Sequence, residues 1–315
     1  MKQIIFLTGH RKSGTTLLKS LLDGHPDITV YPTDLGLLYA YFPHCKLKKK
    51  PKNELIKNII LKILKRFRLA NKYTKYSNQK MLEYELYLKK KNNTINLLSE
   101  KKVILTVIQS WLSFFGIKQK KYILIKETTQ SMNYKLLKKI FNKIKIIQII
   151  RDPRDNYASI KSGYSRYYKK IGYDEETLLL SSIIRIKNDL KFAKILSKKN
   201  YFYPIKYEKL VKNPKVEIRK ILRFLKLNVN NFKIKPTNSN LEYYGNSYER
   251  KIRGISKFNV NRWKYRIHSQ EQNFINFYLY DEIKSWNYPN LNKNYFDKFH
   301  IKYNQINSKL FYKKK

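Results

Sequence analysis

The chain has 315 residues, a formal net charge of +46 and a single cysteine, Cys45. One cysteine excludes both an intramolecular disulfide framework and a cysteine-based zinc cluster. Hydrophobic residues make up 42% of the chain and aromatic residues 15%, which argues against wholesale disorder and supplies a sizeable core.

The positive charge has two interpretations. A basic surface attracts phosphates, nucleic acid or anionic lipid. The alternative is a coding bias, because the chain is rich in Lys, Ile, Asn and Tyr, the residues that AT-rich codons supply. We favour the bias, since the lysines are spread along the whole chain, whereas a nucleic-acid-binding arm is usually one basic block.

The sequence shows neither a targeting segment nor a membrane span. The apolar run Ile4–Leu7 is too short for the core of a signal peptide. The longest uncharged stretch, 103–117, is shorter than the ~20 residues of a spanning helix, so we expect a buried helix there. We therefore expect a cytoplasmic protein, and we leave open a peripheral contact of its basic surface with an anionic membrane.

Predicted strands and helices alternate along the chain. Short apolar, β-branched runs are predicted to be buried strands at Gln3–Gly9, Lys121–Glu127, Lys143–Arg151 and Tyr201–Tyr207. Helical patterns lie between them at Thr15–Leu22, Met132–Phe141 and Pro153–Ser162. This alternation predicts a three-layer α/β/α fold around a central parallel sheet, with ligands at the carboxyl ends of the strands.

The same pattern predicts the domain organisation. We expect a single domain over residues 1–289 and a basic, tyrosine-rich peripheral tail over residues 290–315. Residues 44–110 are basic and mostly helical in pattern, and we expect them to form an insertion that caps the site. The sequence does not indicate an oligomeric state.

The segment from Gly9 to Thr16 has the spacing of a P-loop, with two glycines five positions apart followed by two threonines. Such a loop points backbone N–H groups inward, and the helix after it aims its positive end at an anion. A P-loop kinase would carry lysine at the position of Thr15. Here the lysine is Lys12, inside the loop, so its cation would approach a bound phosphate from another side. A glycine-containing turn without a ligand is the disfavoured alternative.

A second candidate site follows the strand predicted to end at Arg151. Ser159 falls about two turns into the next predicted helix. A guanidinium and a hydroxyl placed in this way can hold one phosphate from two sides. One alternative pairs Arg151 with Asp152 or Asp155 in a structural ion pair. Another places Asp152 on magnesium, but the proline that follows Asp152 favours a helix N-cap.

Taken together, these segments resemble the sulfotransferase family that uses 3′-phosphoadenosine 5′-phosphosulfate (PAPS), and within it the carbohydrate and tyrosylprotein type. The matching segments, in chain order, are Arg11–Leu18 with 22–26, Lys126–Thr128, Arg151–Asp155 with Ser159, Tyr207–Pro214, Gly254–Lys264 and Trp286–Tyr288. The resemblance thus runs from residue 3 to about residue 289 and implies the P-loop-containing α/β fold of that family.

The resemblance also implies roles for single residues, with PAPS as the sulfonate donor and no metal required. Lys12 would contact the sulfonate and the bridging oxygen to the 5′-phosphate. The other donor-binding residues that the resemblance implies are Arg11, Ser13, Gly14, Thr15 and Thr16 in the loop, Arg151 and Ser159 at the 3′-phosphate, Tyr207 at the adenosine and Lys264 over the 3′-phosphate.

Sulfonate transfer to a hydroxyl is an in-line displacement close to phosphoryl transfer, and it gains from a base that takes the acceptor proton. In the resembling family, a carboxylate follows the His-Pro segment, and Asp34 occupies that place here. Asp34 is therefore the candidate base, and a helix N-cap before Leu35 is an equally weighted alternative. His10, His25 and His44 are weaker candidates, and His25 is better explained as a turn residue.

The acceptor cannot be read from the sequence, and a hydroxyl of a carbohydrate or glycolipid is our expectation from the resemblance. Two other functions compete. A P-loop ATP-dependent kinase would use the same loop, but Thr15 and the Arg151–Ser159 pair disfavour it. A basic nucleic-acid-binding protein would use the charge and the many tyrosines, but it would not need the ordered motifs.

Overall fold

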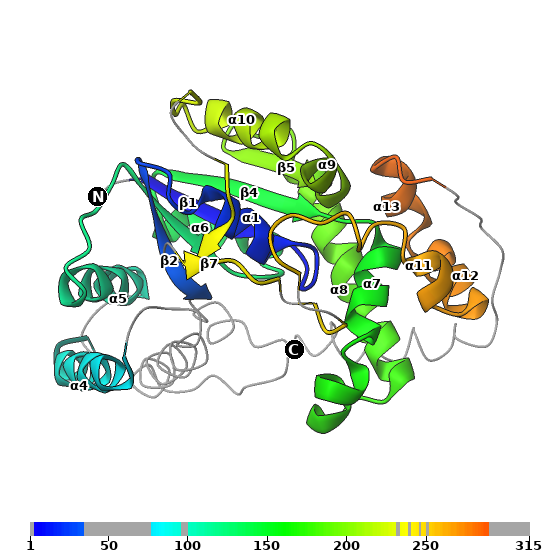
Figure 1. The fold of residues 1–315 in the computed structure, drawn as a ribbon, viewed down its shortest axis with the longest axis horizontal. Helices are drawn as coiled ribbons and strands as arrows, with labels where there is room; N and C mark the ends of the chain where they lie inside the picture. Colours follow the sequence, from blue (N-terminus) through cyan, green and yellow to red (C-terminus); the bar gives the residue numbers. More distant parts are fainter. Residues whose placement is uncertain are drawn as a thin grey trace.

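A five-stranded parallel sheet forms the centre of the protein, with helices on both faces (Figure 1). A computed structural model describes residues 3–34, 77–95, 100–230, 234–238, 241–245, 247–249 and 252–289. The strands of the sheet are β1 (Gln3–Thr8), β2 (Ile28–Asp34), β3 (Tyr122–Lys126), β4 (Ile144–Ile150) and β5 (Phe202–Lys206). A second, antiparallel sheet consists of β6 (Thr237–Asn238) and β7 (Leu241–Glu242).

The α-helices described are α1 (Thr15–Leu22), α4 (Asn78–Ile95), α5 (Glu100–Phe114), α6 (Tyr134–Ile140), α7 (Pro153–Lys161), α8 (Glu175–Leu196), α9 (Tyr207–Lys212), α10 (Pro214–Phe224), α11 (Trp263–Arg266), α12 (Ser269–Tyr278) and α13 (Tyr280–Ser285). Two 3₁₀ turns, η2 (Ser131–Asn133) and η4 (Lys169–Ile171), and a π-helical turn, η3 (Tyr164–Tyr168), complete the described elements.

The strand order β2-β3-β1-β4-β5 determines where the site lies. From β1, the chain builds β2 and β3 on one side and β4 and β5 on the other, so β1 is the point where the strand order reverses. β1 and β4 pair in parallel, with Thr8 opposite Gln148. The loop after β1 and the chain after β4 therefore emerge side by side, where open α/β sheets bind their ligands.

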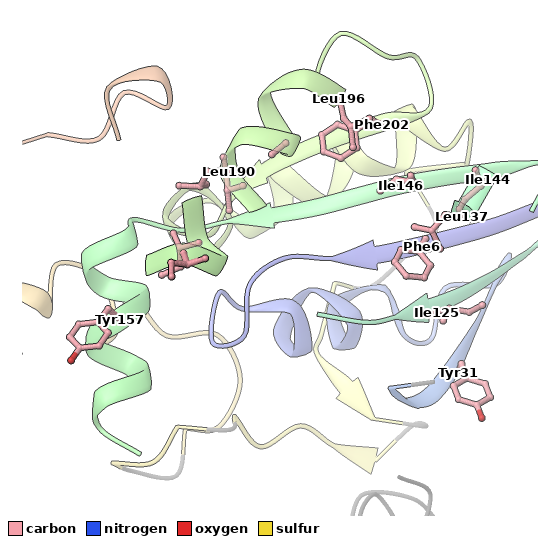
Figure 2. Close-up of a cluster of buried hydrophobic side chains, with 14 of the residues drawn as sticks. Phe6, Tyr31, Ile125, Leu137, Ile144, Ile146, Tyr157, Leu190, Leu196 and Phe202 are labelled. Atoms are coloured by element: carbon pink, nitrogen blue, oxygen red, sulfur yellow. The ribbon is translucent and has the colours of Figure 1, made fainter. Parts of the chain in front are cut away.

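Alternate strand residues fill two hydrophobic clusters, one on each face of the sheet. Ile4 and Phe6 of β1 belong to the first cluster with α5, α6 and α8, and Ile5 and Leu7 belong to the second with α1, α9 and α10. Figure 2 shows part of the first cluster, where Phe6 and Ile146 of the sheet lie near Leu137 of α6. The two clusters confirm the predicted three-layer α/β/α fold, because a strand buried on both faces needs helices on both sides.

The predicted strands and helices lie close to the observed elements, but the edge strand β2 was not predicted. Pro32 lies inside this strand, and the pairing of β2 with β3 shifts between Val30 and Asp34. Proline lacks the backbone N–H that a ladder needs, so a strand that contains it is confined to an edge or a bulge. The sequence pattern alone therefore conceals β2.

Only part of the predicted cap insertion lies within the described residues. The tail over 290–315 and Cys45 lie outside them. Of the insertion, α4 and α5 are described, and α5 packs into the first hydrophobic cluster through Val107, Ile108 and Trp111. The rings of Trp111 and Tyr31 of β2 form a T-shaped pair with a centroid distance of 5.0 Å. Helix α5 confirms a helix over most of residues 103–117, with one face buried and Gln109 and Ser113 exposed. The capping role stays a prediction. Among the described helices, none is long and apolar enough to span a membrane.

Candidate active site

The loop between β1 and α1 has the curled backbone of a phosphate-binding loop. Gly9, Lys12 and Gly14 have positive φ angles of 147°, 65° and 106°. A Cβ atom at Gly9 would lie 2.3 Å from the carbonyl oxygen of Ile149, and one at Gly14 would lie 2.5 Å from the Tyr207 ring. Both positions therefore need glycine. Helix α1 begins directly after Gly14, so its positive end faces the loop.

The chain after β4 supplies the second part of the site. Asp152 caps α7 by accepting a hydrogen bond from the Arg154 backbone N–H (2.9 Å), which confirms the predicted N-cap. Directly before this cap, Arg151 donates from Nη1 to the carbonyl oxygen of Lys12 (2.7 Å) and from Nη2 to that of Asn259 (2.5 Å). The Arg151 guanidinium thus bridges the P-loop and a later segment of the chain.

The two parts line one pocket. Of the predicted site residues, the pocket is lined by Lys12, Gly14, Arg151, Ser159 and Tyr207. The other lining residues are Leu17 of α1 and, in the segment after β7, Tyr243, Gly245, Ser247, Ile252, Gly254, Ser256 and Asn259. The fold therefore brings the two motifs, which lie far apart in the sequence, to a single cavity.

Two cations meet in this pocket against aromatic rings. Lys12 Nζ lies 3.6 Å from the centre of the Tyr248 ring, and the Arg151 guanidinium lies 4.7 Å from that of Tyr207. Burial, and secondly the positive charge of Arg151, lower the pKa of Lys12 to about 8. Aromatic faces attract cations but carry no formal charge. The arrangement therefore favours a ligand with more than one negative charge, which would relieve the repulsion between the two cations.

Buried polar atoms around the loop are also suited to an anion. Nε of Arg151, Oγ of Ser13, and Nε and Nη2 of Arg11 are buried without a hydrogen-bond partner among the described residues. Leaving such groups unsatisfied is costly, and phosphate or sulfonate oxygens would satisfy them. Thr15 is buried and Thr16 half-buried at the start of α1, and neither lines the pocket.

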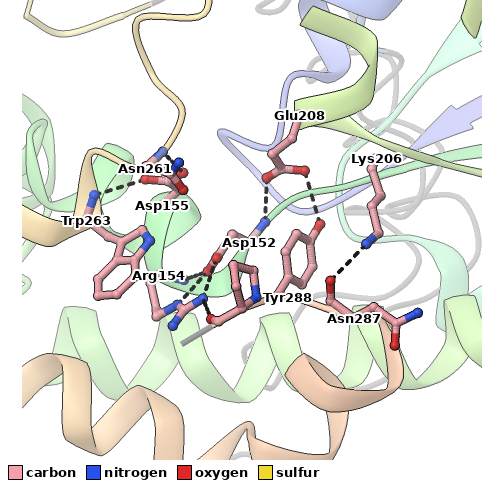
Figure 3. A network of polar contacts seen from close by, with 10 residues as sticks. Asp152, Arg154, Asp155, Lys206, Glu208, Asn261, Trp263, Asn287 and Tyr288 are labelled. Atoms are coloured by element: carbon pink, nitrogen blue, oxygen red, sulfur yellow. Dashed lines mark hydrogen bonds and ion pairs between the residues drawn. The ribbon is translucent and has the colours of Figure 1, made fainter. Parts of the chain in front are cut away.

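A network of hydrogen bonds among charged and polar groups lies at the start of α7 (Figure 3). Arg154 is fully buried and donates to both carboxylate oxygens of Asp152, from Nε (2.9 Å) and Nη2 (2.7 Å). Asp155 accepts hydrogen bonds from two backbone N–H groups, those of Asn261 (2.7 Å) and Trp263 (2.9 Å). Neither carboxylate forms an ion pair with Arg151 in the described structure. The capped and paired state of Asp152 also disfavours the reading of this residue as a magnesium ligand.

Asp34, the predicted base, lies at the carboxyl end of β2, separated from β1 by β3. Lys126 Nζ lies 2.6 Å from its Oδ1. Lys19 of α1 is buried beside this pair and donates from Nζ to the carbonyl oxygen of Pro32 (2.8 Å). Burial, and secondly the charge of Lys126, lower the pKa of Lys19 to about 8. Sequence reasoning gave neither lysine a site role, because their proximity to Asp34 depends on the unpredicted strand β2.

The remaining candidates have varied positions. Asp34 does not line the pocket, and Leu35 lies outside the described residues, so the N-cap alternative stays open. Lys264 is exposed on α11 and does not line the pocket either. His25 accepts a hydrogen bond from the Asp27 backbone N–H (3.1 Å), as expected of a turn residue. His44 lies outside the described residues.

The fold and the pocket define a P-loop α/β protein with a second cationic corner, formed by Arg151 and Ser159 around the start of α7. The chain matches the sulfotransferase family over residues 4–231, and it belongs to that family. It is similar to the omega-hydroxy-beta-dihydromenaquinone-9 sulfotransferase Stf3 of Mycobacterium bovis and of Mycobacterium tuberculosis, with 26% identity over 116 residues. The matched stretch covers 35% of this chain and only 30% of the length of those relatives.

Solved structures agree on the fold. The sulfotransferase domain of the Synechococcus PCC 7002 olefin synthase has a TM-score of 0.59 and 16% identity, covering 92% of this chain and 97% of that domain. The sulfotransferase domain from the curacin biosynthetic pathway has a TM-score of 0.55 and 18% identity, covering 92% of this chain and 99% of that domain. At such identities, the likeness concerns the fold alone.

Proposed function

We propose that this protein transfers a sulfonate group from PAPS to an acceptor hydroxyl. The observation that carries the proposal is the single pocket in which Lys12 and Gly14 of the P-loop meet Arg151 and Ser159 of the second motif. PAPS carries a 5′-phosphosulfate and a 3′-phosphate, so it needs two anion-binding groups at a fixed separation. ATP has no 3′-phosphate, and the second corner would have no counterpart on it.

The residues around the pocket fit this donor. The loop backbone with Ser13, Thr15 and Thr16 would hold the 5′-phosphate, and Arg11 would add its two unpartnered nitrogen atoms. Arg151 and Ser159 would hold the 3′-phosphate, with Tyr207 against the adenosine. Lys264 as a closing residue stays a prediction from the sequence, because Lys264 is exposed and does not line the pocket.

The transfer would break the bond between sulfur and the bridging oxygen of the 5′-phosphate and form a bond between sulfur and the acceptor oxygen. Negative charge grows on the bridging oxygen, and Lys12 together with the N-terminus of α1 would stabilise it. Burial and the charge of Arg151 lower the pKa of Lys12 to about 8 in the free protein. A bound anionic donor would favour the charged form of Lys12 and so support this role.

The acceptor proton would pass to Asp34, held in place by Lys126. Neighbouring parallel strands lie about 4.8 Å apart, so the ends of β2 and β1, with β3 between them, are separated by about 10 Å. The acceptor would lie over the carboxyl end of β3, between the base on β2 and the sulfonate over the P-loop.

The acceptor class is also a proposal. A carbohydrate or glycolipid hydroxyl follows from the resemblance to the carbohydrate and tyrosylprotein type. We likewise propose that residues 1–289 form the single domain that acts on it. The mycobacterial relative is named for an omega-hydroxy dihydromenaquinone, which adds a lipid alcohol to the panel that should be tested. The tyrosine hydroxyl belongs in the same panel.

Incubation with sulfur-labelled PAPS and cell-envelope extracts fractionated into carbohydrate, lipid and protein tests the proposal. We expect label in one fraction with wild type and none with Lys12→Ala. Label in no fraction, together with a thermal shift by ATP–magnesium but none by 3′-phosphoadenosine 5′-phosphate (PAP), would favour the kinase. Tight binding of nucleic acid that falls steeply with salt, without PAP binding, would favour a basic nucleic-acid-binding protein.

A further inference from the structure

Among the described residues, hydrogen bonds join the P-loop to Asn156 of α7 and to Arg151 just before this helix, and two of these bonds involve the Asn156 side chain. Asn156 donates from Nδ2 to the carbonyl oxygen of Arg11 (2.8 Å), and its Oδ1 bonds to Nδ1 of His10 (2.8 Å). A further bond runs from Arg151 to the carbonyl oxygen of Lys12 (2.7 Å). Asn156 lies on α7 between Arg151 and Ser159, the two residues of the second phosphate corner.

The surroundings of Asn156 leave its amide one orientation. Because Nδ2 donates to the Arg11 carbonyl, Oδ1 faces His10, and His10 Nδ1 must carry the hydrogen. Asn156 is 2% exposed and His10 is 3% exposed. Moving the loop relative to α7 would break both bonds and leave buried polar groups unsatisfied. The amide therefore acts as a rigid spacer between the two segments.

Asn156 differs from Arg151 in its relation to the pocket. Arg151 lines the pocket, so a phosphate there would compete with the Lys12 carbonyl for its guanidinium. Asn156 does not line the pocket, and no ligand in it would compete for the amide. The two hydrogen bonds of Asn156 would therefore persist in the ligand-bound protein, whereas the bond from Arg151 to the Lys12 carbonyl would weaken.

We propose that Asn156 is a positioning residue that fixes the separation of the two phosphate subsites. With the separation fixed, the pocket selects a nucleotide phosphorylated at both the 5′ and 3′ positions over one that carries a single phosphate. This inference rests on the proposed function, because it takes the P-loop as the 5′ subsite and the Arg151–Ser159 corner as the 3′ subsite. The separation of the subsites matters only for a ligand that binds both of them. Loss of Asn156 should therefore leave the affinity for ligands with a single phosphate unchanged.

Calorimetric titration of the full chain with PAP, adenosine 5′-monophosphate and adenosine 3′-monophosphate tests the inference. We expect Asn156→Ala to weaken PAP binding about ten-fold, the effect of one or two lost buried hydrogen bonds, and to change the binding of either monophosphate less than about two-fold. Asn276→Ala is the matched control, because Asn276 is also a buried asparagine, on α12 and outside the pocket. It should leave all three affinities unchanged.

A second variant keeps the test decisive if Asn156→Ala does not fold. Asn156→Asp retains the oxygen that faces His10 but places a second oxygen against the Arg11 carbonyl, so PAP should again weaken relative to both monophosphates. An unchanged ratio of PAP to monophosphate affinity in the folded variants, including an equal loss for all three ligands, overturns the inference. Absence of PAP binding to the wild type, in contrast, overturns the proposed function itself.

Discussion

Arg151 and Arg154 lie three residues apart at the junction of β4 and α7, and their surroundings differ sharply. Arg154 is fully buried, donates to both oxygens of Asp152 and to the carbonyl oxygen of Pro289 (2.6 Å), and stacks on Trp263 at 4.1 Å (Figure 3). Arg151 is 5% exposed, donates to two carbonyl oxygens and keeps Nε without a partner. The described residues pair no carboxylate with Arg151.

Under the proposed function, this difference separates a structural arginine, Arg154, from a ligand-binding one, Arg151. A buried cation with a two-oxygen carboxylate partner is satisfied within the fold, and its loss leaves the partner uncompensated. A buried cation that donates only to carbonyl oxygens, with carboxylates near it but none hydrogen-bonded to it, keeps more of its desolvation cost until an anion binds. The same motif, Arg-Asp-Pro-Arg-Asp, therefore supplies one arginine to the pocket and one to the scaffold that holds the C-terminal segment.

The largest effect should follow from loss of Arg154. Arg154→Ala leaves the Asp152 carboxylate buried without its partner, and we expect the free energy of unfolding to fall by about 3–5 kcal/mol. Denaturant unfolding measures this change. Arg151→Ala is the matched control, and its loss of stability should be smaller, about 1–2 kcal/mol, because it removes hydrogen bonds to two carbonyl oxygens but leaves no buried charge unpaired. Equal losses for both variants would break the comparison.

Loss of Arg151 should act on the ligand instead. Arg151→Ala should weaken PAP binding about 100-fold, or about 3 kcal/mol, because charge-assisted hydrogen bonds to the 3′-phosphate disappear. Calorimetric titration measures the affinity, and Ser159→Ala, which removes a neutral hydroxyl, should lose less. Unchanged affinity in Arg151→Ala would remove this residue from the site.

Asp34 sharpens the comparison, because it is paired with Lys126 and yet is the proposed base. Asp34→Asn should lower turnover about 100-fold, the lower range for loss of a general base, while PAP affinity stays unchanged. Steady-state kinetics with labelled PAPS measure this, and Asp23→Asn serves as the control, since Asp23 accepts a hydrogen bond from Thr237 (2.8 Å). Full activity of Asp34→Asn would make Asp34 a structural partner of Lys126, like Asp152 for Arg154.

The smallest effect concerns pH. Lys12 has a pKa of about 8 in the free protein, so it is charged below pH 8 and neutral above it. A bound anion favours the charged form, and PAP affinity should therefore fall about ten-fold between pH 7 and pH 9 as binding comes to require proton uptake. Titration across this range measures the change. Lys19→Met, which removes the other lysine with a pKa of about 8, should retain the fall, and a flat profile in wild type would contradict it.

The sequence was informative where local patterns decide the structure. The apolar strands around β1 and β4, the glycines of the P-loop and the Asp152 cap all carry their cause within a few residues. Strand β2 was missed because Pro32 interrupts its pattern. Helix α8 was missed because its own buried residues, such as Leu178, Leu179 and Leu180, point to different sides of the helix. Its sequence therefore shows no single apolar stripe.

Contacts between distant segments could not be read from one sequence. Asn156 looks like an ordinary polar helix residue until the fold places His10 and the Arg11 carbonyl beside it. The pairing of Asp34 with Lys126 likewise depends on the register of β2 and β3. Which of the two arginines near α7 is compensated also depends on packing, since both have aspartates nearby in the sequence.

Calorimetric titration of the wild-type protein with PAP and, separately, with ATP–magnesium tests the central claim most directly. A pocket built from a P-loop and a second cationic corner should bind PAP, and should bind it more tightly than ATP–magnesium. Tighter binding of ATP–magnesium, or no heat of binding with PAP, would contradict the account.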